Sequence, residues 1–256
     1  MIIDTHAHFD DKAFEEDREL VLTQLSEHGI GRVINSGASL EGCKRTIELT
    51  EKYDFIYGTL GIHPCDCEDL KEEDIQWLKQ QCVREKIVAV GEIGLDYYWD
   101  EPDRELQKKW FARQMKLAKE IQLPMVIHSR DAAQDTINMM KEYHAQEVGG
   151  VIHCYSYSKE SAKDYLDMGF YFGIGGVVTF QNGKKLKEVV EYLPMDRILT
   201  ETDSPYLSPV PNRGKRNDSR NLPYVVAEIA RIKGLSVEEV EAICLENAHR
   251  LYKKLK

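Results

Sequence analysis

The chain lacks three features that would place it outside the ordinary globular proteins. No apolar run approaches the roughly 20 residues of a membrane-spanning helix, so no membrane association is expected. The amino terminus has no basic segment followed by an apolar one, and a strand-like run begins at Ile2. We therefore expect no secretory signal and a cytoplasmic location. No stretch rich in Pro, Gly and Ser divides the chain, which favours a single domain over residues 1–256.

Cysteine and positive charge are also in short supply. The 6 cysteines are scattered through 256 residues, and a chain of this length builds its core without disulfides, so reduced thiols are expected. Acidic residues outnumber basic ones by 44 to 34, giving a net charge of -10. This charge argues against nonspecific binding to duplex DNA, because such binding depends on Lys and Arg side chains that neutralise phosphates. A local phosphate site remains possible, and the one conspicuous basic segment is residues 213–220.

Apolar runs rich in β-branched residues alternate with charged segments of helical periodicity. The predicted strands are residues 2–8, 31–37, 55–61, 87–92, 124–128, 149–153, 170–174 and 197–203. The predicted helices lie near residues 14–28, 39–53, 70–84, 103–121, 131–146, 158–168, 184–192 and 222–233. Such alternation predicts parallel strands with helical crossovers. Eight repeats fit a closed (β/α)8 TIM barrel, of the α/β class, better than an open doubly wound sheet.

An additional C-terminal helix follows the eighth repeat. It is expected from Ser236 to about Leu255, because Ser236 and Glu239 have the spacing of a capping box. We expect this helix to seal the outside of the barrel.

Six side chains with metal-binding chemistry stand at the predicted carboxyl ends of strands. His6 and His8 are two residues apart in a strand, so both imidazoles point to the same side. The full set is His6, His8, Glu92, His128, His153 and Asp203. The carboxyl ends of barrel strands converge on one mouth, where active sites of this architecture lie. The six residues therefore predict a metal centre.

Six ligands are too many for one tetrahedral ion with an open position, but they suit two divalent ions that share a carboxylate. We expect His6, His8 and Asp203 to hold one ion, His128 and His153 the other, and Glu92 to bridge them. Nitrogen and oxygen ligands are compatible with zinc, manganese or magnesium and do not choose among them.

The chain resembles the TatD family of metal-dependent hydrolases, within the amidohydrolase-like barrels. The motifs that carry the resemblance are Asp4-Thr5-His6-Ala7-His8-Phe9, Gly61-Ile62-His63-Pro64, Val90-Gly91-Glu92-Ile93-Gly94-Leu95-Asp96, Pro124-Met125-Val126-Ile127-His128-Ser129-Arg130, His153-Cys154-Tyr155 and Thr200-Glu201-Thr202-Asp203-Ser204-Pro205. The resemblance implies a metal-dependent deoxyribonuclease, including 3′ to 5′ exonuclease action on single-stranded DNA. It implies the same six metal ligands.

The mechanism that follows assigns a role to each residue near the mouth. We expect Asp203 to orient a water and accept its proton, and Glu92 to act as the bridging carboxylate. Glu201 holds a metal ligand in place or is a buried ion-pair partner. The expected substrate-binding residues are His63, which could instead be packed to anchor a turn, together with Arg130 and Arg213.

Two other functions fit the same residues. One is hydrolysis of another ester, such as a misacylated tRNA, in an aminoacyl-tRNA deacylase. The other is a non-enzymatic binding module that metal ions merely stiffen. No obligate protein partner is evident. Tyr97, Tyr98 and Trp99 could stack on unpaired bases or pack their own loop.

Overall fold

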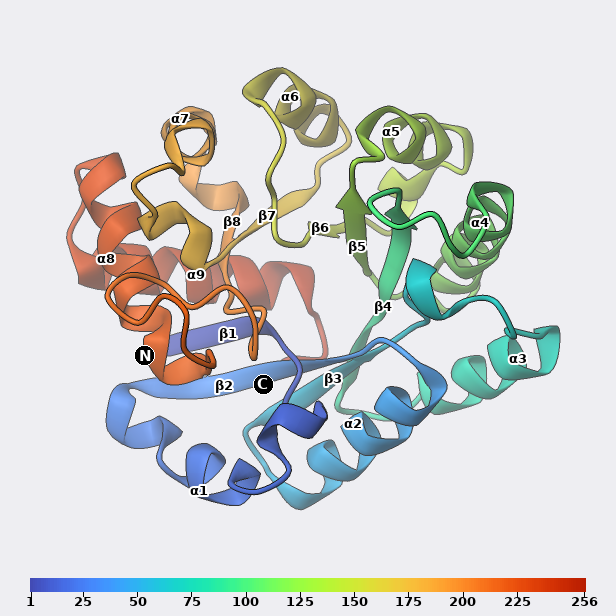
Figure 1. Cartoon of the computed structure of the whole chain (residues 1–256), viewed down its shortest axis with the longest axis horizontal. Coiled ribbons are helices and arrows are strands. Elements are labelled where there is room, and N and C mark those ends of the chain that lie inside the picture. Colours follow the sequence, from blue (N-terminus) through green and yellow to red (C-terminus); the bar gives the residue numbers. More distant parts are fainter.

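Eight parallel strands form the centre of the molecule, and helices surround them (Figure 1). The computed structural model describes all residues, 1–256. The strands are β1 (Ile2–Ala7), β2 (Ile30–Gly37), β3 (Ile56–Leu60), β4 (Ile87–Asp96), β5 (Met125–Arg130), β6 (Gly150–Ile152), β7 (Tyr171–Ile174) and β8 (Ile198–Thr200). They are hydrogen bonded in the order β1 to β8, each parallel to the next. The predicted (β/α)8 barrel is confirmed.

The helices connect these strands on the outside of the barrel. They are α1 (Arg18–Thr23), α2 (Leu40–Lys52), α3 (Glu72–Gln81), α4 (Arg104–Ile121), α5 (Ala133–Glu142), α6 (Lys159–Asp167), α7 (Lys184–Tyr192), α8 (Leu222–Lys233) and α9 (Val237–Leu251). The prediction of one helix over residues 14–28 is wrong. The chain there forms two short 3-10 turns, Lys12–Phe14 and Leu25–His28, on either side of α1. The Arg18 guanidinium donates to the carbonyls of Phe9 and Asp11, which precede the first of these turns, and stabilises the broken path.

Between β8 and β1 the barrel closes through a few specific bonds. Thr200 Oγ1 donates to the Ile3 carbonyl at 3.0 Å, and Thr5 Oγ1 donates to the Thr200 carbonyl at 3.0 Å. Beyond the end of β8, the His8 amide donates to the Ser204 carbonyl at 2.8 Å. These bonds fix the first strand, with its two histidines, against the last.

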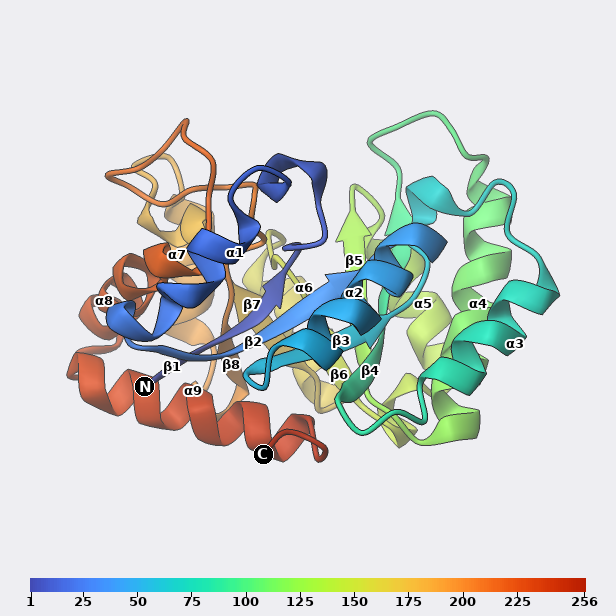
Figure 2. The same cartoon turned by 90° about the horizontal axis from the view of Figure 1, so that it is seen from below.

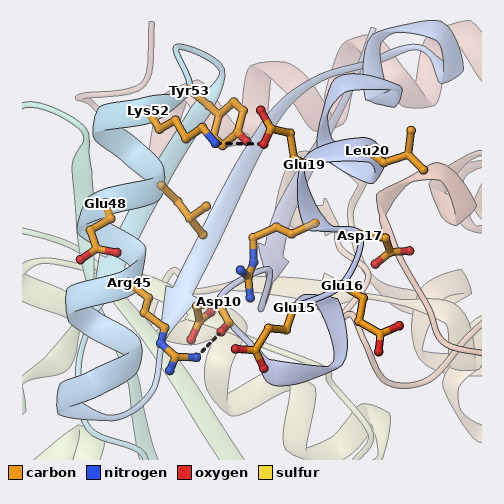
Figure 3. A pocket seen from close by; sticks show the side chains of 12 residues that line it. Asp10, Glu15, Glu16, Asp17, Glu19, Leu20, Arg45, Glu48, Lys52 and Tyr53 are labelled. Atoms are coloured by element: carbon orange, nitrogen blue, oxygen red, sulfur yellow. Dashed lines mark hydrogen bonds and ion pairs between the residues drawn. The ribbon is translucent and has the colours of Figure 1, made fainter.

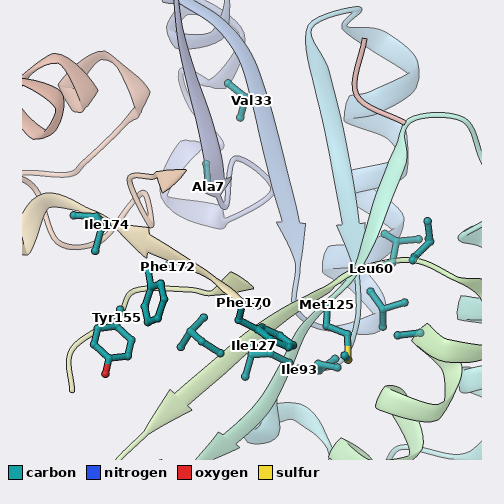
Figure 4. Close-up of a cluster of buried hydrophobic side chains, with 14 of the residues drawn as sticks. Ala7, Val33, Leu60, Ile93, Met125, Ile127, Tyr155, Phe170, Phe172 and Ile174 are labelled. Carbon is teal, nitrogen blue, oxygen red and sulfur yellow. The ribbon is translucent and has the colours of Figure 1, made fainter. Parts of the chain in front are cut away.

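Two hydrophobic clusters divide the core. The larger one, of 56 buried residues, includes the outward-facing strand residues and the inner faces of the surrounding helices (Figure 4). The smaller one lies inside the barrel, near the start of the strands. Its strand residues are Ile3, Ile34, Tyr57, Val88, Ala89, Val126, Val151, Tyr171 and Leu199.

The final helix completes the smaller cluster. From α9 and the residues after it come Ala248, Leu251, Tyr252 and Leu255. The predicted capping box of Ser236 and Glu239 is present. The expectation that this helix covers the outside of the barrel is corrected: α9 lies beneath the end where the strands begin (Figure 2). Lys254, just beyond it, donates to the carbonyl of Ile87, the first residue of β4.

No helix is both long and apolar enough to cross a bilayer. All 6 cysteines are free thiols, as expected.

Candidate metal centre

The predicted ligands come together at the carboxyl ends of the strands. A cleft of about 820 Å³ opens there, and five of the six predicted ligands line it. These are His8, Glu92, His128, His153 and Asp203. The sixth, His6, lies beneath the surface of the cleft and is only 1% exposed.

Glu92 lies between two pairs of histidines. Its Oε2 atom is 3.4 Å from His6 Nε2 and 3.6 Å from His8 Nε2. Its Oε1 atom is 2.8 Å from His128 Nδ1 and 3.2 Å from His153 Nε2. Burial alone would raise the pKa of Glu92, but the charge of His153 and the hydrogen bonds from His128, His153 and His6 hold this pKa well below its usual range. The carboxylate is therefore ionised, with one oxygen facing each pair.

The first pair is completed by Asp203. Its Oδ1 atom is 3.5 Å from His8 Nε2 and 3.9 Å from His6 Nε2, and the two Nε2 atoms are 3.1 Å apart. His8 Nδ1 donates to the Ser36 carbonyl at 2.8 Å, which fixes the ring. Burial would lower the pKa of His8, but its bond to Asp203 and the charges of Asp203 and Glu92 raise it to about 9. These three residues form a possible metal-binding group.

His153, in the second pair, is supported from behind by Glu201. The Nδ1 atom of His153 is 3.3 Å from Glu201 Oε1, and that oxygen accepts a 2.6 Å hydrogen bond from the Cys154 amide. A Cβ atom at Gly173 would lie 2.0 Å from Glu201 Oε2. Glycine at position 173 therefore makes room for this buried carboxylate.

His128 has a second carboxylate partner that sequence reasoning missed. Asp96 Oδ2 is 3.0 Å from His128 Nε2, on the side of the ring opposite Glu92. The prediction that strand four ends at Glu92 is wrong, because β4 continues to Asp96. Residues four positions apart in a strand point to the same side, so a longer predicted strand would have placed Asp96 beside Glu92.

Gly94 lies between Glu92 and Asp96 in β4. A Cβ atom at this position would lie 1.8 Å from the His128 carbonyl, so a side chain there would separate β4 from β5.

His63 also faces the centre, but its tautomer differs. Its Nδ1 atom accepts a 3.1 Å hydrogen bond from the Cys65 amide, so the neutral ring carries its proton on Nε2. That Nε2 atom is 3.7 Å from Glu92 Oε1. Burial and the nearby charge of His128 lower the pKa of His63 to about 3, so the ring is neutral. His63 therefore presents an N–H donor to the cleft and not a lone pair for a metal.

The two predicted arginines occupy different places. Arg130 lines the cleft, and its guanidinium lies 3.7 Å from the centre of the Tyr98 ring. Arg213 is not among the residues that line the cleft, and its guanidinium lies 4.3 Å from the centre of the Phe180 ring. Its role in substrate binding stays a prediction.

The rest of the basic segment is largely neutralised by its own surroundings. Arg216 pairs with Asp17 at 2.6 Å, and Arg220 pairs with Asp218 at 2.8 Å. The segment therefore contributes less free positive charge than its composition suggests.

The charges in the cleft fit bound cations. Six carboxylates line it, from Asp10, Asp11, Asp66, Glu92, Asp96 and Asp203, against the one guanidinium of Arg130. The imidazole nitrogens of His6 and His8 converge on carboxylate oxygens at 3.4 to 3.9 Å. Converging nitrogen and oxygen donors with excess negative charge are the ligands that first-row divalent ions take.

A second cavity, of about 760 Å³, lies between α1 and α2 (Figure 3). None of the five histidines lines it, and four of its six acidic residues, Glu15, Glu16, Glu19 and Glu48, are exposed to solvent. Lys52 there pairs with Glu19 at 3.3 Å. It has no donor set comparable to that of the cleft.

Comparison with known proteins agrees with this geometry. The family described as TatD related DNase matches residues 3–253. The uncharacterized metal-dependent hydrolase YabD of Bacillus subtilis is 44% identical over 253 residues, covering 99% of both chains. The uncharacterized metal-dependent hydrolase YcfH of Escherichia coli is 34% identical over 98% of this chain and 95% of its own.

Solved structures give the same result. The TatD homologue YjjV of Escherichia coli superposes with a TM-score of 0.92 at 32% identity, over 98% of each chain. A phosphotriesterase homology protein of Escherichia coli superposes with a TM-score of 0.68 at 15% identity, a likeness that extends to the fold alone.

Proposed function

We propose that this chain, which belongs to the TatD family of metal-dependent hydrolases, is a deoxyribonuclease. Its substrate is single-stranded DNA, which it digests from the 3′ end, and its cofactors are two divalent ions of zinc, manganese or magnesium. The observation that carries the proposal is the position of Glu92, with Oε2 toward His6 and His8 and Oε1 toward His128 and His153. We also propose a cytoplasmic location.

The ligands divide into two groups around Glu92. His6, His8 and Asp203 would hold one ion, and His128 and His153 the other. Two bound ions supply positive charge for both the attacking and the leaving oxygen of a phosphodiester and make water a stronger nucleophile.

Asp203 is the proton acceptor in this proposal. Burial would raise its pKa, but the hydrogen bond to His8 and the charges of the nearby histidines lower it, so the carboxylate is ionised. It lines the cleft, and its side chain is 16% exposed, so a water in the cleft can reach it. Glu201 would keep His153 oriented, as carboxylates behind metal-bound histidines commonly do.

Two donors are available for the substrate phosphate. Arg130 has no carboxylate partner within ion-pair distance, and stacking on Tyr98 holds its guanidinium at the cleft. A guanidinium free to form two parallel hydrogen bonds suits phosphate. His63 would add a neutral N–H donor.

Hydrolysis of labelled oligonucleotides tests the proposal. Single-stranded DNA labelled at its 5′ or 3′ end is incubated with the purified protein and zinc, manganese or magnesium, with and without a chelator. We expect metal-dependent shortening from the 3′ end. Asp203→Asn should lower kcat by at least about 100-fold. Asp69→Asn, which makes the same charge change at an exposed position outside the cleft, should not.

Two results would contradict the proposal. Intact oligonucleotides beside rapid hydrolysis of an aminoacyl-tRNA would identify an ester hydrolase of the other class. No turnover of either substrate, with metal bound and the protein stabilised, would indicate the binding module.

A further inference from the structure

Exposed apolar side chains gather at the mouth of the cleft. Five of the eleven large hydrophobic residues that are exposed lie in just two loops: Tyr98, Trp99, Tyr206, Leu207 and Val210. The first two follow β4, and the other three follow β8. Single exposed apolar residues are common on protein surfaces, but a group beside a catalytic cleft indicates a binding surface.

The two loops lie on opposite sides of the barrel. The eight strands are in the order β1 to β8 around the sheet, so β4 and β8 are half a turn apart. Trp99 lines the cleft from the β4 side, and Tyr206 and Leu207 line it from the β8 side. The candidate metal ligands lie between these two walls.

On the β4 side, Trp99 touches its own loop with only part of its ring. The residue is 55% exposed, and its ring meets that of Tyr98 edge-on, with centroids 4.8 Å apart. Arg130 lies over the Tyr98 ring. An exposed indole therefore stands next to the one guanidinium of the cleft.

On the β8 side, the position of Tyr206 is fixed relative to the metal centre. The Tyr206 amide donates to the Asp203 carbonyl at 2.8 Å, and its own carbonyl accepts a 2.8 Å bond from Asn217 Nδ2. The phenol donates to Asp11 at 3.2 Å, yet Tyr206 remains 55% exposed. This wall is held in place by its backbone.

We propose that Trp99 and Tyr206 are stacking surfaces for the two unpaired nucleobases that flank the cleaved phosphodiester. The inference rests on the proposed function and extends it to the recognition of bases. Every base has a π-face, so stacking tolerates all sequences. A base inside a duplex is stacked on its neighbours at both faces and offers none to either ring, which favours single strands.

The test combines two changes: a base is removed from the substrate, and an aromatic ring is removed from the protein. The substrates are single-stranded oligonucleotides, complete or with one abasic residue on either side of the terminal phosphodiester. We expect Trp99→Ala and Tyr206→Ala each to lower kcat/KM on the complete strand by about 5- to 100-fold, mainly through KM. Each should have little further effect once the base that its ring stacks on is missing.

Three control variants separate stacking from other roles. Trp99→Phe and Tyr206→Phe keep an aromatic face and should retain most of the activity; the second also removes the bond to Asp11. Tyr192→Ala removes an exposed ring on α7, away from the cleft, and should behave as the wild type. The inference is wrong if alanine at 99 and 206 has no more effect than at 192, or lowers cleavage of complete and abasic strands equally.

A binding measurement separates this inference from the proposed function. Affinities of the Asp203→Asn protein, alone and combined with Trp99→Ala, are measured by fluorescence anisotropy on complete and abasic strands. Base-dependent binding that Trp99→Ala removes would support the stacking surfaces even if the wild type does not cut DNA. Binding that ignores the bases would overturn them even if it does.

Discussion

The buried carboxylate of Asp4 makes a strong prediction about how stability depends on pH. Asp4 is fully buried in β1 and joins this strand to the loop that follows β8. Its Oδ2 atom accepts 2.6 Å hydrogen bonds from Thr202 Oγ1 and Ser219 Oγ. Its Oδ1 atom accepts from the amides of Thr202 and His6, at 3.0 and 3.3 Å. Burial nevertheless outweighs these bonds and raises the pKa of Asp4 to about 7.

The pKa gives both the sign and the size of the effect. A raised pKa in the folded protein means that folding is favoured while Asp4 is protonated, below its ordinary pKa of 3.8. This contribution is lost as the pH rises through about 7. Each pKa unit corresponds to about 1.36 kcal/mol, so the free energy of unfolding should fall by about 4 kcal/mol over this window on account of Asp4.

Asp4→Asn isolates that contribution. The asparagine oxygen can accept from the two amides, and its NH2 group can donate to the hydroxyls of Thr202 and Ser219, which rotate. Urea unfolding of the metal-free wild type and variant is measured from pH 4 to 8. Relative to the wild type, the variant should gain about 4 kcal/mol across the window, since other titrating groups are common to both proteins.

Asp4→Ala is the control for the hydrogen bonds themselves. It leaves two amides and two hydroxyls without their acceptor and should lower the free energy of unfolding by about 3 kcal/mol or more. A difference between wild type and Asp4→Asn that stays constant with pH would refute the reasoning. It would mean that the four donors fully compensate the burial of Asp4 and that its pKa in the folded protein stays at the ordinary value of 3.8.

Three further predictions concern the metal centre and the fold. Gly173→Ala should displace Glu201 from His153 and weaken metal affinity by about 10- to 100-fold, as measured by calorimetric titration; unchanged affinity would exclude this support. Ser236→Ala breaks the capping box and should lower the free energy of unfolding in urea by about 1 kcal/mol, and no change would show that the cap is dispensable. Chelation should lower the melting temperature, and adding metal at 100 times its Kd should stabilise the protein by about 2.7 kcal/mol; a melting temperature independent of metal would contradict a metal centre.

The fold was predictable because its signals are local and repeat eight times. Each strand is an apolar run, and a segment of helical periodicity follows it. Errors at the ends of these elements do not change the topology. The failures lie where nonlocal contacts decide. The broken helix around α1 depends on the Arg18 guanidinium reaching the carbonyls of Phe9 and Asp11. The position of α9 depends on the apolar layer around Tyr57 and Tyr171, which needs a cover at that end.

The positive rim at the mouth could be predicted only in part. Composition locates Arg130 and Arg213 after strand ends, but it cannot tell which guanidinium is free. Arg130 is held at the cleft by Tyr98, whereas Arg213 stacks on Phe180 away from it. Arg216 is paired with an acid of the first loop. Charge in a loop is therefore weak evidence for a binding surface until its partners are known.

The face on which a ligand lies depends on strand irregularities that the alternation of residues does not reveal. In β1, Ile3 belongs to the cluster inside the barrel, so strict alternation would turn His6 outward and Ala7 inward. Ala7 instead packs in the outer cluster, and His6 reaches Glu92 inside the mouth. The pairing of β1 with β2 shifts register between Asp4 and Ala7, and such irregularities re-aim side chains next to active sites. The two-residue spacing correctly predicts that His6 and His8 point the same way, while the shift determines that both point inward.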